Sequence, residues 1–223
     1  MDKTKNLIIV GDSAFAEIAY EYFLHDSNYS ISAFSVEEKF IKKASLFGIP
    51  VVPFETLPHS HPPKAYDVYV AIPYTQLNRL RTRLAASAKQ QGYHLASYIS
   101  SKSFVWSNVK IGEHCFIFEN NTIQPFCNIE DNVILWSGNH IGHHSTIRNN
   151  CFISSHVVIS GFCDIGENSF LGVNSTLANN ITVGQNNWVG PSTTIMKNTP
   201  DNAFFKTETA ISHKLSSLEF FKL

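Results

Sequence analysis

The sequence has no excess of charge of either sign. Of its 223 residues, 17 are Lys or Arg and 18 are Asp or Glu, so the formal net charge is −1. A surface that binds nucleic acid normally shows a basic excess, and so does a segment that binds anionic lipid. The composition therefore argues against nucleic acid and membrane surfaces as partners.

Long apolar runs are missing as well. No stretch approaches the roughly 18 apolar residues of a membrane span. The apolar part of MDKTKNLIIVG is too short for a secretory signal. Hydrophobic residues still make up 43% of the chain and charged residues only 16%, which predicts a well-filled core. We therefore expect a soluble, cytoplasmic protein without a membrane partner.

The cysteines lack the spacing of a zinc site. The chain has four of them, Cys115, Cys127, Cys151 and Cys163, and no two form a Cys-x-x-Cys pair. All four occupy the same phase of the repeat described next. Small buried hydrophobic side chains are therefore the favoured interpretation, and no metal is expected.

The second half of the chain has a period of six residues instead. From Ile99 to Ile195, every sixth residue is Ile, Val or Leu, without an insertion. The residue four positions later is mostly small, and pairs such as Asp131-Asn132 precede it at the bend, where Asn tolerates a left-handed backbone. Three short strands would close one coil, and coils would stack through parallel pairing. The repeat predicts a parallel β-helix of hexapeptide repeats over residues 98–200.

Residues 1–97 alternate between strand and helix patterns. Segments 7–11, 31–38, 51–54 and 66–73 are typical of strands, and 14–25 and 75–92 of helices. This alternation predicts an α/β domain with a small parallel, Rossmann-like sheet. The turn GDSAFA after the first strand is not GxGxxG. It is either an ordinary strand–helix turn or a site for a polar ligand group at the helix start. Residues 201–223 are expected to form a C-terminal tail and helix.

Four of the ten histidines lie close together in the repeat: His140, His143, His144 and His156. Positions 18 apart stack, so His143 lies beside Gly161, whose open space suits a general base that needs access to substrate. His144 lies between Phe126 and Phe162, where a packing role is as plausible as a chemical one. A metal site is an alternative, but the repeat does not place these histidines on one face.

Taken together, the residues resemble the left-handed β-helix acyltransferases and, within them, the PglD/NeuD-like sugar acyltransferases. The resemblance spans the chain and rests on IIVGDSAFA, VAIPYTQLNRLRTRL, IGHHSTI (141–147) and VGPSTTIMKNTPDNAFF (189–205). It implies acetyl-CoA-dependent N-acetylation of a nucleotide-linked amino sugar in the biosynthesis of a surface polysaccharide or glycan, such as lipopolysaccharide. It also implies a homotrimer with active sites between subunits. The alternatives are a sugar O-acyltransferase, a metal-dependent hydratase of the carbonic-anhydrase type, and a scaffold trimer.

The resemblance also implies a set of site residues. His143, as general base, and His144 take the catalytic positions. Acetyl-CoA is expected at Phe152, Gly161, Val173 and Pro191. The nucleotide-sugar is expected at Gly11, Ser13, Ala14, Phe15, Ser35, Pro73 and Tyr74. Three positions depart from the family pattern, because His144 replaces an acidic residue, and Phe152 and Phe15 each replace a histidine.

Overall fold

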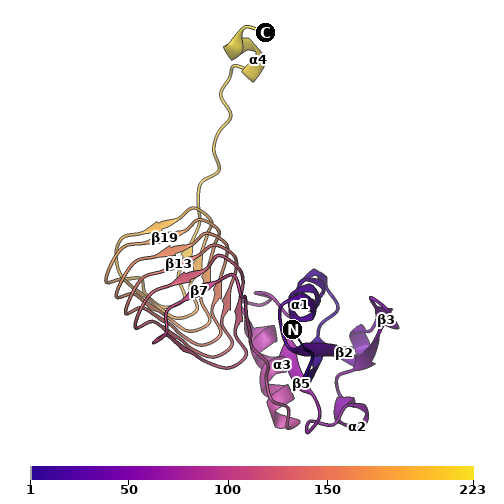
Figure 1. Ribbon diagram of the computed structural model, residues 1–223. Helices are drawn as coiled ribbons and strands as arrows, with labels where there is room; N and C mark the ends of the chain where they lie inside the picture. Colours follow the sequence, from indigo (N-terminus) through magenta and orange to yellow (C-terminus); the bar gives the residue numbers. More distant parts are fainter. Residues whose placement is uncertain (1) are drawn as a thin grey trace.

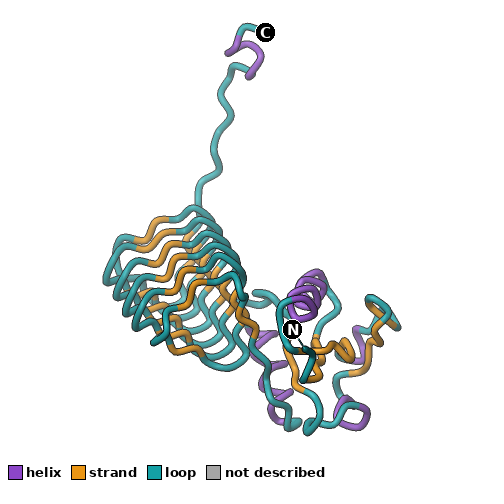
Figure 2. The backbone as a smooth tube through the Cα atoms, in the orientation of Figure 1, coloured by secondary structure: helices purple, strands orange, loops and turns teal. Residues whose placement is uncertain are grey.

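The chain forms an α/β unit followed by a stack of triangular β-coils, and the two pack against each other (Figure 1). The computed structural model describes residues 2–223. Beyond the coils, the last residues run away from the body as an extended tail that ends in a short helix (Figure 2). The predicted order of α/β domain, β-helix and C-terminal helix is confirmed.

The α/β unit contains one five-stranded sheet. Its strands are β1 (Lys5–Val10), β2 (Tyr29–Val36), β3 (Ser45–Leu46), β4 (Ile49–Pro53) and β5 (Asp67–Val70), in the order β3-β4-β2-β1-β5. All neighbours are parallel except the short β3–β4 hairpin, which the sequence did not predict. Along β1, Leu7 and Ile9 join one hydrophobic cluster, and Ile8 and Val10 join another. Both faces of the sheet are therefore covered, as an apolar run in a parallel strand requires.

The helices of this unit are α1 (Ala14–His25), the 3-10 helix η1 (Glu38–Phe40), α2 (Leu57–Ser60) and α3 (Arg79–Gln90). Helix α1 matches the predicted segment 14–25. Helix α3 starts four residues later than the predicted segment 75–92. The reason is the backbone of Gln76, Leu77 and Asn78, whose φ angles are 54°, 50° and 66°. Three successive left-handed residues form a turn and cannot belong to a right-handed helix.

The β-helix has three faces, each named here after its first strand. The β6 face contains β6 (Tyr98–Ile99), β9 (Phe116–Ile117), β12 (Ile134–Leu135), β15 (Phe152–Ile153), β18 (Phe170–Leu171), β21 (Trp188–Val189) and β23 (Phe204–Phe205). The β7 face contains β7 (Phe104–Val105), β10 (Thr122–Ile123), β13 (His140–Ile141), β16 (Val158–Ile159), β19 (Thr176–Leu177) and β22 (Thr194–Ile195). The β8 face contains β8 (Lys110–Ile111), β11 (Asn128–Ile129), β14 (Thr146–Ile147), β17 (Asp164–Ile165) and β20 (Thr182–Val183).

The aliphatic residues of the six-residue period fill the interior of the coils. Ile123, Ile141 and Leu177 are fully buried there. Strands pair with the strand 18 residues on, for example Ile123 with Ile141, so each coil repeats the one below it. All four cysteines are buried and free, as expected for small interior residues.

The α/β unit and the β-helix share one hydrophobic core. Phe15 of α1 packs against Phe116 and Phe118 of the β6 face, with ring centroids 5.8 and 6.4 Å away. The side chain of Arg81 on α3 is fully buried and donates hydrogen bonds to the carbonyl oxygens of Pro73 (2.7 Å) and Asn150 (3.1 Å). These contacts fix the carboxyl ends of the parallel strands beside the β6 face.

Strand β6 starts at Tyr98, and at the other end β23 pairs with β21, so the β6 face continues past residue 200. The division of the chain into units 1–97, 98–200 and 201–223 stays a prediction. Helix α4 (Ser217–Phe221) is shorter than the expected terminal helix and begins with a capping box between Ser216 and Glu219. Among residues 2–223, no helix combines the length and apolar character needed to span a bilayer.

Candidate active site

His143 lies at the corner between the β7 and β8 faces and is exposed. Its backbone N–H donates to Oε1 of Gln124 in the coil below, at 2.9 Å. Its ring leans over Gly161 in the coil above, where a Cβ would lie 2.9 Å from Cε1 and 3.0 Å from Nε2. Any residue but glycine at 161 would thus displace the imidazole. The space predicted beside His143 is occupied by the ring itself.

His144 is held between two aromatic rings. Its centroid lies 4.6 Å from that of Phe126 and 4.9 Å from that of Phe162, with interplanar angles of 25° and 17°. Its Nδ1 lies 3.1 Å from Nδ1 of His143. The stack expected from the 18-residue spacing is present. We call Phe126, His143, His144 and Phe162 the histidine corner.

An aromatic pocket of about 360 Å³ opens elsewhere, between the loop after β5 and the β6 face. It brings together residues that the resemblance assigned to two different ligands: Pro73 and Tyr74 for the sugar, and Phe152, Val173 and Pro191 for acetyl-CoA. The remaining lining residues are Trp136, Ser154, Ser155, Phe170, Gly172 and Trp188. The walls are mainly apolar, which suits an aliphatic arm and the less polar face of a sugar ring.

The back wall of the pocket is a ladder of stacked rings. Phe152, Phe170 and Trp188 come from successive coils, with centroids 5.6 and 4.0 Å apart and interplanar angles of 20° and 13°. Tyr74 contacts this ladder and remains 43% exposed, with its centroid 4.8 Å from that of Phe170. Phe170 and Trp188 are not among the site residues predicted from the sequence, although their spacing of 18 residues from Phe152 places the three rings in one stack.

The N-terminal turn is only partly accessible. Ser13 and Ala14 are exposed at the start of α1. Gly11 has φ of +128° and packs close to the chain, since a Cβ there would lie 3.0 Å from the carbonyl oxygen of Ala71. The expectation for Phe15 and Ser35 needs correction: Phe15 is 4% exposed inside the shared core, and Ser35 is fully buried. Neither side chain is open to a ligand, because the β6 face and the neighbouring strands cover them.

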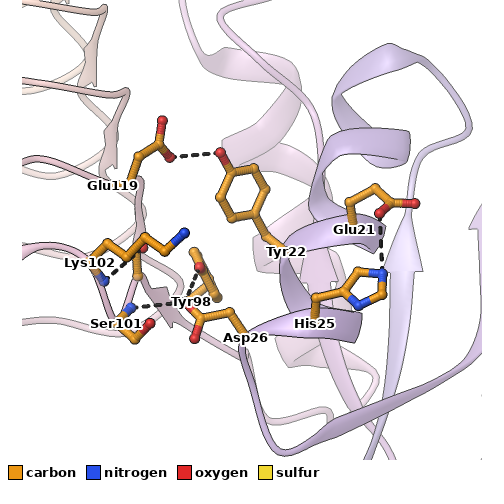
Figure 3. A pocket seen from close by; sticks show the side chains of 9 residues that line it. Glu21, Tyr22, His25, Asp26, Tyr98, Ser101, Lys102 and Glu119 are labelled. Carbon is orange, nitrogen blue, oxygen red and sulfur yellow. Dashed lines mark hydrogen bonds and ion pairs between the residues drawn. The ribbon is translucent and has the colours of Figure 1, made fainter.

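A second cavity, of about 390 Å³, lies at the seam between α1 and the first coil (Figure 3). Several of its polar side chains are paired with each other. The Tyr22 hydroxyl donates to Glu119 at 2.7 Å, and the Tyr98 hydroxyl donates to Asp26 at 2.7 Å. Burial, followed by the bond to Glu119, raises the pKa of Tyr22 to about 12. The cavity is a polar joint between the two units.

No cluster of three His, Cys, Asp or Glu side chains in residues 2–223 is arranged to hold a metal ion. The histidine corner is also separate from the aromatic pocket on the chain. His143 and Gly161 lie between the β7 and β8 faces, whereas Phe152, Val173 and Pro191 lie on the β6 face and the turn after it. One chain therefore keeps the expected catalytic residues apart from the residues that line the aromatic pocket.

The repeat region matches a known protein family. The family described as bacterial transferase hexapeptide (six repeats) matches residues 126–161 and 144–179. The matched part of the chain therefore contains hexapeptide repeats of the type that this family has. No curated protein shows significant sequence similarity to it.

Solved structures share the architecture of this chain over most of its length. The acetyltransferase domain of PglB from Neisseria gonorrhoeae is 22% identical, with a TM-score of 0.80, and the match covers 90% of this chain and 96% of that one. The perosamine N-acetyltransferase of Caulobacter crescentus, in complex with CoA and GDP-perosamine, is also 22% identical, with a TM-score of 0.80 and coverage of 89% and 92%. WeeI from Acinetobacter baumannii is 17% identical, with a TM-score of 0.69 and coverage of 90% and 96%. The resemblance is confirmed in repeat and fold, including the left-handed β-helix.

Proposed function

We propose that this protein transfers an acetyl group from acetyl-CoA to the amino group of a nucleotide-linked amino sugar. The observation that carries the proposal is the exposed imidazole of His143, which lies against Gly161 at the histidine corner. It occurs in a fold that joins an α/β unit to a β-helix. Two structures of the same fold support the choice of substrates: the PglB domain bound to acetyl-CoA, and the perosamine N-acetyltransferase bound to CoA and GDP-perosamine.

The reaction requires a general base and a group that stabilises the negative charge on the carbonyl oxygen. The neutral sugar amine attacks the thioester carbonyl carbon, a C–N bond forms, and the amine proton passes to Nε2 of His143. A backbone N–H of the β-helix stabilises the resulting oxyanion. The C–S bond then breaks, and the CoA thiolate takes the proton back from His143. General-base catalysis of this kind contributes about 10²–10⁴-fold.

The aromatic pocket would hold the reacting ends of both substrates. Phe152, Val173 and Pro191 offer apolar surface for the pantetheine arm of CoA, and Pro73 and Tyr74 bound the same space from the α/β unit. Ser13 and Ala14, exposed at the start of α1, remain the candidates for the nucleotide. A phosphate there would face free backbone N–H groups at a helix N-terminus.

We further propose that the active protein is a homotrimer, as the resemblance implied. The reason is the separation of the histidine corner from the aromatic pocket, since one copy of the chain supplies both parts without joining them. A neighbouring copy whose histidine corner faces the pocket would complete the site.

The test is thiol release from acetyl-CoA with UDP-, dTDP- and GDP-linked 3-amino and 4-amino sugars, with their hydroxyl counterparts as controls. Turnover on an amino sugar is the expected result. Turnover on a hydroxyl counterpart alone would replace N-acylation by O-acylation. If neither class reacts and calorimetry detects no CoA binding, the acyltransferase proposal is wrong.

A mixing experiment tests the shared site. His143→Asn removes the base, and Val173→Trp fills the pocket at an exposed position, so each variant alone should be inactive. Refolded mixtures should regain part of the activity, because some interfaces then combine an intact corner with an intact pocket. Mixtures that stay inactive, although sedimentation shows trimers, would place the whole site within one copy.

A further inference from the structure

The two imidazoles of the histidine corner lie within hydrogen-bond distance of each other. Nδ1 of His143 and Nδ1 of His144 are 3.1 Å apart. A hydrogen bond between two ring nitrogens needs one protonated donor and one bare acceptor. With both rings neutral, the proton sits on one Nδ1, and its position decides which nitrogen of His143 faces the solvent with a lone pair.

The surroundings of the pair fix the rings and supply no other charge. His144 is stacked between Phe126 and Phe162 on a left-handed backbone with φ of 59°. His143 stands perpendicular to both His144 and Phe162, at 89°. Gln124, which accepts from the backbone N–H of His143, and Gly161, which lies against the His143 ring, do not titrate. Within residues 2–223, neither imidazole forms an ion pair with a carboxylate.

We propose that His144 is a positioning residue whose Nδ1 accepts the hydrogen bond of His143 Nδ1–H. This contact holds His143 in the tautomer that leaves the Nε2 lone pair free, beside Gly161, for the incoming amine. The inference rests on the proposed function, because it concerns the residue proposed there as the base.

In place of a carboxylate, the rings of Phe126 and Phe162 stabilise the positive charge that forms during the reaction. When Nε2 of His143 accepts a proton, the pair carries one positive charge, and the proton between the two Nδ1 atoms remains between them. Both imidazole centroids lie within 5.0 Å of the Phe162 ring, and His144 also faces Phe126. A cation over the face of an aromatic ring, within about 6 Å of its centroid, is stabilised by the ring quadrupole. His144 lies in this position toward both phenylalanine rings.

The first test reads the tautomer and needs no substrate. Protein labelled with ¹⁵N-histidine is examined by long-range ¹H–¹⁵N correlation at a pH where His143 is neutral, and the His143 signals are assigned by their loss in His143→Asn. The expected pattern is a protonated Nδ1 and a bare Nε2. In His144→Gly, which keeps the left-handed backbone without strain, the pattern should move toward protonated Nε2. A protonated Nε2 in the unaltered protein would overturn the proposal.

The second test uses kinetics and conservative rescue. His144→Gly should lower kcat/KM about 10- to 100-fold, a part of the total contribution of a general base. His144→Asn, whose amide oxygen can accept from Nδ1–H and whose backbone tolerates the left-handed region, should recover most of this loss. His144→Asp should move the acid limb of the pH profile to higher pH, because a carboxylate favours the protonated form of His143.

A matched control is His156→Gly, which removes a histidine from another corner of the same left-handed geometry, with φ of 57°. It should change neither the tautomer of His143 nor the pH profile. Full activity and an unchanged profile in His144→Gly would overturn the positioning role while leaving the acetyltransferase proposal intact. The expected tautomer with no acetyl transfer to any acceptor would instead support the pair and contradict the proposed function.

Discussion

Two corners of the β-helix have the same backbone geometry but carry different side chains. The corner between the β8 and β6 faces, here the asparagine corner, carries Asn132, Asn150, Asn168 and Asn186, with φ between 56° and 65°. The histidine corner has φ of 59° to 64° at Phe126, His144 and Phe162. The turn is therefore the same, and the difference lies in the side chains placed on it.

The asparagine corner is satisfied internally. Nδ2 of Asn132 donates to Oδ1 of Asn150 at 2.8 Å, and Nδ2 of Asn168 donates to Oδ1 of Asn186 at 3.1 Å. Helix α3 covers part of it through Arg81. Asn is also among the residues that tolerate a left-handed backbone best. The sequence and the structure agree at this corner, as expected where the role is stability.

The histidine corner carries residues that are unfavourable on a left-handed backbone. Phe126 and Phe162 are 60% and 53% exposed, and bulky residues are disfavoured in the left-handed region. They bury little surface and add strain, so they contribute little to folding in the single chain. Residues that cost stability at a repeated turn thus coincide with the active site proposed above.

The largest expected effect concerns activity at the histidine corner. His143→Asn should lower kcat/KM by about 10²–10⁴-fold, because a neutral amide cannot accept the proton of the amine. The side chain is exposed, so the midpoint of thermal unfolding should stay within about 2 °C of the unaltered protein. Thiol-release kinetics and calorimetry measure the two quantities. Activity retained in this variant would assign the base elsewhere.

The largest effect on stability is expected beside the asparagine corner. Arg81→Met should lower the free energy of unfolding by about 3–5 kcal/mol, since buried carbonyl oxygens of both units lose their donor. The neighbouring exposed Arg79, which donates to Asn186 at 2.8 Å, is the control. Arg79→Met should change the free energy by less than about 1 kcal/mol in urea unfolding. Equal effects would mean that burial of Arg81 does not hold the units together.

One substitution at each corner tests the comparison between them. Asn150→Leu should cost about 2–3 kcal/mol, because it introduces left-handed strain, removes the acceptor that lies 2.8 Å from Nδ2 of Asn132, and removes the donor to Oε1 of Glu167. Phe162→Asn should change stability by less than about 1 kcal/mol, since relief of strain offsets the lost stacking. The second change should still lower kcat/KM. Similar stability losses at both corners would contradict the division of roles.

The smallest effect is expected at the polar joint in Figure 3. Burial opposes ionisation of Asp26 and Glu119, but hydrogen bonds from Tyr98 and Ser101 to Asp26, and from Tyr22 to Glu119, leave both pKa values below their ordinary range. The folded state then binds fewer protons than the unfolded state in acid. This stabilisation is present at neutral pH and is lost as the pH falls from about 4.5 through the folded pKa values.

Urea unfolding between pH 7 and pH 3 measures this dependence. Asp26→Asn should flatten it, whereas Glu208→Gln in the exposed tail should leave it unchanged. An unaltered slope in Asp26→Asn would show that the joint does not contribute to acid sensitivity.

The sequence by itself determined the β-helix, its coil length and the placement of His143, His144 and Gly161 on one corner. This was possible because the period of six is a local rule in which every coil repeats the same inward residue and the same turn. The contact of His144 with Phe126 and Phe162 followed from the 18-residue spacing alone. The parallel strands of the α/β unit were also readable from their apolar residues, whereas the short strand β3 was not.

Only the tertiary structure decided which predicted residues are accessible. Phe15 follows β1 just as Ser13 does, and Ser35 lies near the end of β2, yet the side chains of Phe15 and Ser35 are buried. The aromatic pocket likewise forms only where Tyr74 of one unit meets Phe152 and Trp188 of the other. Burial depends on what packs against a residue from far away in the chain, and a local pattern holds no record of that partner.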